Sequence, residues 1–142
     1  MQRKIHSEML PSLAIHGSAY GFRRNRNIVS HAHNHVGKDI LMLFDIEHCF
    51  HSITWRSIYT RFKHLDYSPE ITKYLTGLCT HQLSRSSAIV KQLDSQQQKL
   101  LVQRHLPQGA PTSPTLSNIV MHSMDKRLAG LSKKLDLSLI HI

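Results

Sequence analysis

An apolar stretch that ends in a carboxylate constrains the fold of this chain more than any other feature. Residues Ile40 to Phe44 are all apolar and are followed directly by Asp45. A short unbroken apolar run is typical of a strand buried on both faces. A carboxylate at the end of such a strand is costly unless something pairs with it, and Mg²⁺ accepts one or two carboxylates together with substrate phosphates. Asp45 is therefore either a metal ligand or an aspartate that begins a turn.

The composition predicts one basic domain. The 142 residues include 18 Lys and Arg against 9 Asp and Glu, a formal net charge of +9. Such a charge attracts polyanions, but it does not separate nucleic acid from an anionic membrane surface. No apolar run approaches the roughly 18 residues of a spanning helix, and the start lacks the apolar part of a signal peptide. We expect a soluble, cytoplasmic protein with no membrane partner, and with Cys49 and Cys79 reduced.

Capping residues and periodicity predict several helices. Residues 1–13 and 27–36 each fit a helix, the second stopped by Gly37. Ser52 or Thr54 caps a helix that ends near residue 64. Ser68, followed by a proline, begins another that ends near residue 81. The buried face of that last helix is expected to carry Ile71, Leu75 and Leu78. Residues 99–104 fit a strand, with 86–93 as its partner strand or a helix.

Two segments before the apolar stretch carry polar side chains of functional interest. A loop with two glycines leads into Arg23, Arg24 and Arg26. Arginine forks fit phosphate oxygens, so this cluster is either a triphosphate clamp or an ordinary solvated basic loop. His31 and His35 share one helical face, as metal-binding histidines often do, but no nearby Cys or carboxylate completes a site. We therefore set the metal reading of these histidines aside.

A second motif follows at residues 106–118. Pro107 and Pro111 stiffen a loop in which Gly109 permits close backbone approach. Ser113 then fits a helix N-cap, with Pro114 at the first helical position. Along this helix one apolar stripe is expected to be buried. Its members are Leu116, Val120, Met124, Leu128, Leu131 and Leu135.

Together the two stretches resemble motifs A and B of the reverse transcriptases, most closely the bacterial retron and group II intron type. The first motif in that family is an apolar strand followed by Asp and Ile, then Phe, Ser and Ile at fixed spacing. This chain matches it with Asp45, Ile46, Phe50, Ser52 and Ile53. The second motif is matched by Leu-Pro-Gln-Gly at 106–109. Retron enzymes also carry Asn-Ala-x-x-His near residue 31, where this chain has His in place of Asn.

The resemblance implies an α+β fold, a partial fingers and palm with an antiparallel palm sheet flanked by helices. Residues 1–37 would be a fingers portion and 38–66 palm motif A with its following helix. Residues 67–105 would be a helix and connection, and 106–142 the motif B loop and a truncated palm helix. The activity implied is RNA-directed DNA synthesis, in which a dNTP is joined to a primer 3′-hydroxyl by two metal ions.

The resemblance also implies roles for individual residues. Asp45 and the carbonyl of Ile46 would bind Mg²⁺, two ions in the complete enzyme, with Mn²⁺ as the alternative. Phe50 would lie against the sugar of the incoming nucleotide and exclude a 2′-hydroxyl. The other nucleotide contacts implied are Arg23, Arg26, Cys49, Gln108 and Gly109. The partners implied are an RNA template, a DNA primer or RNA–DNA duplex, dNTP and, in some relatives, a cognate non-coding RNA.

One family element has no counterpart in this sequence. The reverse transcriptases carry a Tyr-x-Asp-Asp hairpin that supplies further metal ligands, and no Asp-Asp occurs here. The simplest hypothesis is that both ends are cut, that residues 138–142 are not native coding sequence, and that this polypeptide alone is inactive. The alternative is a non-catalytic module that binds RNA or an RNA–DNA duplex. A purely structural partner protein would leave both motifs unexplained.

Overall fold

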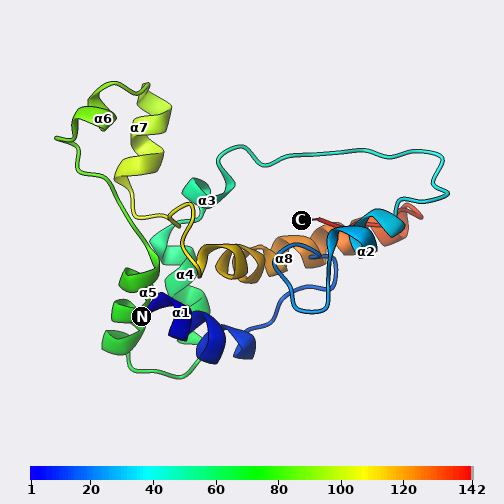
Figure 1. Cartoon of the computed structure of the whole chain (residues 1–142), viewed down its shortest axis with the longest axis horizontal. Coiled ribbons are helices and arrows are strands. Elements are labelled where there is room, and N and C mark those ends of the chain that lie inside the picture. The colour runs from blue at the N-terminus through cyan, green and yellow to red at the C-terminus, as the bar shows by residue number, and fades with distance from the viewer. Residues whose placement is uncertain (142) are drawn as a thin grey trace.

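The computed structural model describes residues 1–141, which form helices joined by loops. In Figure 1, α8 lies along the long axis, α4 and α5 gather near its N-terminal end, and the connection between α2 and α3 arches away from them. Ile142, the last residue of the segment expected to be non-native, lies outside the described residues. The elements in chain order are α1 (Gln2–Lys4), η1 (Ile5–Met9), η2 (Leu10–Ser12), α2 (Ile28–His33), α3 (Cys49–Ser52), α4 (Trp55–Lys63), α5 (Pro69–Cys79), α6 (Ala88–Lys91), α7 (Ser95–Val102) and α8 (Ser113–Lys134).

The core lies where α4 meets α5 and the first turns of α8. Ile58 and Phe62 of α4 and Leu116 of α8 are fully buried. The amide of Leu106 donates to the carbonyl of Ile53 at 3.3 Å, so the residues that flank the two motifs enter this core together. The buried cluster comprises Ile5, Leu10, Ile53, Ile58, Phe62, Cys79, Leu106, Leu116 and Ile119.

The predicted α+β class and its palm sheet are wrong for this structure. Residues 1–141 contain no strand and only isolated bridges, at Ala19 with His141 and at His105 with Thr54 and His81. The stretch 40–44 is exposed irregular chain, with Phe44 89% exposed. A strand takes its hydrogen bonds from neighbouring strands. No backbone hydrogen bond among the described residues involves 40–44, so the apolar run has nothing to pair with.

The starts of α4 and α5, which are set by local capping, were predicted correctly. The side chain of Thr54 accepts a hydrogen bond from the amide of Ser57 at the start of α4. The helix ends at Lys63, with His64 as its C-cap. Ser68 caps α5 in the same way, with Pro69 in its first turn. Residues 2–12 are helical as expected, and α2 follows its Asn27 cap but ends at residue 33, before the predicted 36.

The predicted buried face of α5 is wrong. Thr72, Thr76 and Cys79 are buried, whereas Ile71 and Leu78 are exposed and Leu75 is only half-buried. The hydroxyl of Thr76 donates to the carbonyl of Thr72 at 2.7 Å, which satisfies a buried polar group inside the helix. Because a buried hydroxyl can be hydrogen-bonded in this way, a face of small side chains can pack against α4.

Two predictions in the second half of the chain are also wrong. Residues 99–104 do not form a strand, because Asp94 caps α7 by accepting hydrogen bonds from the amides of Gln96 and Gln97 at 2.8 and 2.9 Å. Within 86–93, the helix alternative is correct for Ala88–Lys91, which form α6. The apolar stripe of α8 is buried at Leu116 but exposed from Met124 onward. At roughly 1.5 Å per residue, α8 extends well beyond the shorter α4 that covers its first turns.

Candidate nucleotide and nucleic-acid site

Asp45 lies in the exposed connection before α3. A left-handed residue, His48 at φ 52°, precedes the first turn of α3, which carries Cys49 and Phe50 half-buried against the core. Burial raises the pKa of the Cys49 thiol, and the nearby Asp45 carboxylate raises it further. Both cysteines are free thiols, as expected. Asp45 and Ile46 are exposed, and the carbonyl of Ile46 accepts a hydrogen bond from the amide of Cys49 at 3.2 Å.

The Leu-Pro-Gln-Gly loop is held by the start of α8. Gln108 and Gly109 are exposed at its tip, and Gly109 has φ +85°, a conformation that favours glycine. A side chain at Gly109 would meet nothing within 4 Å, so glycine is required for conformation rather than for space. The buried Ser113 hydroxyl donates to the carbonyl of Pro107 at 2.6 Å. The cap of α8 is Thr112 rather than the predicted Ser113, because Ser113 lies inside the helix and uses its hydroxyl for this bond.

The arginine-bearing loop is anchored to α8 and to itself. The Asn118 amide donates to the carbonyl of Gly21 at 2.9 Å. Nη1 of Arg23 donates to the carbonyls of His16 and Ala19, at 3.0 and 3.4 Å. The guanidinium of Arg26 lies 3.9 Å from the centre of the Tyr20 ring. Arg23 therefore helps to shape this loop, and only the remaining donors of its guanidinium are free for a phosphate.

The structure brings some of the predicted residues together and leaves others apart. Asn118 joins the arginine-bearing loop to the helix that also holds the Gln108 loop, and α3 contacts α8. No hydrogen bond or ion pair within residues 1–141 joins Asp45 to either loop. The rings of His31 and His35 lie 5.1 Å apart, edge to face. The described residues hold no group of three His, Cys, Asp or Glu side chains that could bind a metal.

Sequence reasoning missed a cluster of histidines beside α3. The ring of His51 lies 5.0 Å from that of the buried His105 and 6.1 Å from that of His48. Burial lowers the pKa of His51, and the two neighbouring histidines lower it further. Nothing in the local sequence predicted this meeting, because His105 is separated from α3 by more than fifty positions. It also missed Asn118 and the hydroxyl of Ser113, whose partners lie in other segments.

A membrane-crossing helix is absent from the described part of the chain, since none of its helices is both long and apolar enough. A family model described as reverse transcriptase (RNA-dependent DNA polymerase) matches residues 1–140. The chain is 34% identical to the retron Mx162 reverse transcriptase of Myxococcus xanthus, over 94% of this chain and 27% of that protein. It is 28% identical to the retron Ec86 enzyme of Escherichia coli, over 92% of this chain and 34% of that protein.

A third relative is the retron Mx65 reverse transcriptase of Myxococcus xanthus, 28% identical over 94% of this chain and 31% of that protein. The chain thus spans about a third or less of the length of the relatives it matches. The family model nonetheless matches almost the whole chain, and it covers Asp45 as well as the Leu-Pro-Gln-Gly loop. This chain belongs to the reverse transcriptase family.

Proposed function

We propose that this chain is part of a retron-type reverse transcriptase that copies RNA into DNA in the cytoplasm. The observation that carries the proposal is the family match over residues 1–140, together with three relatives named as retron reverse transcriptases. In this proposal the parent enzyme joins dNTPs to a primer 3′-hydroxyl on an RNA template, and residues 1–37 belong to its fingers. Residues 38–66 hold palm motif A and its following helix, 67–105 a helix and connection, and 106–142 the motif B loop and a truncated palm helix.

The proposed residue roles rest on exposure and position. Asp45 and Ile46 are exposed residues, and the Asp45 carboxylate and the second lone pair of the Ile46 carbonyl would contribute oxygen ligands to Mg²⁺ or Mn²⁺. Phe50 and Cys49 lie on the next helical turn and would contact the incoming nucleotide. Gln108 and Gly109 form the exposed tip of a loop that the Ser113 hydroxyl anchors at Pro107, which suits contact with a base pair. Arg26 and the remaining donors of Arg23 would meet phosphates.

The residues present do not by themselves fit a complete magnesium centre. Asp45 is not accompanied by two further metal-binding side chains within residues 1–141. A two-metal centre needs several oxygen ligands held 2.0 to 2.1 Å from each ion, by the usual geometry of Mg²⁺. We therefore propose that the chain alone does not extend a primer. Metal-dependent primer extension by the purified 142-residue protein would refute this part of the proposal.

The test of the polymerase proposal is a chimeric enzyme. Residues 1–140 would replace the matching segment of the retron Mx162 reverse transcriptase, and RNA-templated DNA synthesis would be measured. We expect the chimera to make DNA and its Asp45→Asn variant to fall to background. The matched control is Asp39→Asn, an exposed carboxylate in the same connection, which should leave synthesis unchanged. Equal activity of the Asp45→Asn and Asp39→Asn chimeras would refute the role of Asp45.

A second candidate function is a non-catalytic module that binds RNA or an RNA–DNA duplex. The net charge of +9 favours it, since such a surface attracts polyanions without any chemistry. The chimera experiment distinguishes the polymerase function from the binding function. An inactive but folded chimera, combined with salt-sensitive binding of a primer–template by this chain, would favour the binding module.

A further inference from the structure

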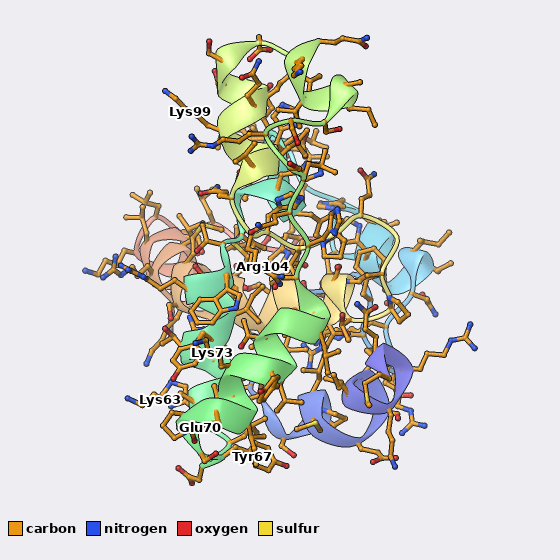
Figure 2. All side chains as sticks on the ribbon, turned by 90° about the vertical axis from the view of Figure 1, so that its left-hand side faces the viewer. Lys63, Tyr67, Glu70, Lys73, Lys99 and Arg104 are labelled. Carbon is orange, nitrogen blue, oxygen red and sulfur yellow. The ribbon has the colours of Figure 1, made fainter. Side chains whose placement is uncertain are left out.

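A hollow of about 660 Å³ opens on the exposed side of α5. It lies between α5, the start of α4 and residue 104, on the face that Figure 2 turns toward the viewer. Apolar and charged side chains share its lining. They include Trp55, Tyr74 and Leu78 on the apolar side and Glu70, Lys73 and Arg104 on the charged side.

The apolar side of the hollow exists because α5 turns its small residues inward. Thr72, Thr76 and Cys79 face the core, so Tyr74 and Leu78 are left outside. Tyr74 is 76% exposed, although it is one of the largest side chains of the helix. No described element covers this face. An exposed aromatic patch bordered by charged groups is typical of a binding surface.

One ring of the hollow is fixed in orientation. The indole of Trp55 stacks on the ring of Tyr59, with 4.9 Å between centroids and 17° between planes. Stacking on Tyr59 restrains the indole, and Trp55, but not Tyr59, is among the residues that line the hollow. A ring held in this way offers a preformed surface to a flat partner. Such surfaces are what nucleobases stack on in proteins that bind single strands.

The charge around the hollow is mainly positive. Nη1 of Arg104 donates to the carbonyl of Gly77 at 3.2 Å and to the hydroxyl of Thr80 at 3.2 Å, which fixes the guanidinium at the edge of the hollow. Its other donors make no hydrogen bond within the described residues. Figure 2 shows cationic residues following one another down this face, with Glu70 and Tyr67 toward one end. In order these are Lys99, Arg104, Lys73 and Lys63.

We propose that this face binds single-stranded RNA, with a base in the hollow against Trp55 and Tyr74 and the backbone along the lysines and Arg104. A row of cations complements a phosphate backbone, while fixed aromatic rings complement unpaired bases. A protein partner could cover the apolar side chains of the hollow, but the row of cationic side chains favours a polyanion. The choice of RNA rests on the proposed function, in which this family copies an RNA strand. The surface is distinct from the residues assigned to nucleotide binding.

The sole tryptophan of the chain lies in this hollow, which gives a probe confined to the proposed site. Fluorescence of Trp55 would be followed in the full 142-residue chain while a short oligouridine is added at low salt. In parallel, anisotropy of a labelled oligouridine would report binding anywhere on the protein. We expect both signals to saturate together, with quenching of Trp55, and the affinity to fall as salt rises.

Two variants, each with a matched control, test the contacts. Tyr74→Ala should weaken binding by at least about 5-fold, the lower end of what stacking of one base contributes. Tyr67→Ala, an exposed tyrosine outside the hollow, should change affinity less than this. Lys73→Glu should weaken binding more than Lys134→Glu, which makes the same charge change in the last turn of α8. Far-ultraviolet circular dichroism would check that each variant keeps its helices.

The outcomes separate this inference from the proposed function. Anisotropy that reports binding without any quenching of Trp55 would overturn the inference and leave the polymerase proposal intact. Equal effects of Lys73→Glu and Lys134→Glu would also overturn it, because the charge near the hollow would then have no special role. Equally strong quenching by a double-stranded RNA, or tighter binding of an oligothymidine, would overturn the assignment to single-stranded RNA. Failure of the chimera alone would leave the binding result standing.

Discussion

Replacing Ser113 with alanine tests whether the first turn of α8 holds the loop that carries Gln108 and Gly109. The Ser113 side chain is fully buried, and its hydroxyl oxygen lies 2.6 Å from the carbonyl oxygen of Pro107. Within residues 1–141, Pro107 accepts no other hydrogen bond. Leaving a buried acceptor without its donor costs about 1–3 kcal/mol. Because Pro107 is only half-buried, we expect the Ser113→Ala variant to lose about 1–2 kcal/mol of unfolding free energy, measured by chemical denaturation.

Ser117→Ala is the matched control for this experiment. Ser117 is also buried on α8, and its hydroxyl donates to the carbonyl of Pro114 at 2.8 Å. That carbonyl belongs to the helix, where it also accepts the amide four residues on. Alanine removes one of two donors there and improves helix propensity by roughly 0.5 kcal/mol, so the net change should be near zero. Equal destabilisation by the two substitutions would refute the argument that the loop depends on Ser113.

Four further outcomes are expected. Burial raises the pKa of Cys79 to about 11, so its thiol should resist alkylation at neutral pH until the protein unfolds, as mass spectrometry of labelled peptides would report. Asp45→Asn should speed alkylation of Cys49, because loss of the carboxylate charge lowers that thiol's pKa; an unchanged rate would contradict this. Burial lowers the folded-state pKa of His51, so stability should be lost as pH falls below the unfolded value of about 6.5, and His51→Gln should flatten that dependence. Phe62→Ala should cost about 3–5 kcal/mol in denaturant unfolding, more than Phe62→Leu, since the ring is fully buried.

What the sequence predicted well depended on neighbours along the chain. Thr54 and Ser68 each cap the residues that follow them, and a cap requires only a few local atoms. The stretch 40–44 was read from its apolar residues alone, but a strand also needs a partner for its backbone. That partner is a distant segment, and none of the described segments pairs with this one. The α+β prediction failed for this reason.

Which face of a helix is buried was harder to predict than where the helix begins. On α5, hydrophobicity pointed to Ile71 and Leu78, yet the helix buries Thr72 and Thr76. The hydroxyl of a threonine can donate a hydrogen bond to the carbonyl four residues earlier, as that of Thr76 does. This bond offsets the free-energy cost of burying the hydroxyl. The hydrophobic pattern of the sequence then no longer distinguishes the buried face of the helix from the exposed face. The same limit applies to the candidate site, where the partners of Asn118 and Ser113 came from the fold and not from the motifs.

The first two turns of α8 connect two of the three stretches assigned to the candidate site by hydrogen bonds. Ser113 holds the Gln108 loop, and Asn118 holds the arginine-bearing loop through the carbonyl of Gly21. Asp45 makes no such bond to α8 among the described residues and lies in exposed chain that leads into the short α3. Substitutions in these turns of α8 should therefore change the positions of the two loops, whereas Asp45→Asn should change only the local charge. Hydrogen bonds to α8 position the arginine and Gln108 loops, whereas no hydrogen bond to α8 positions Asp45.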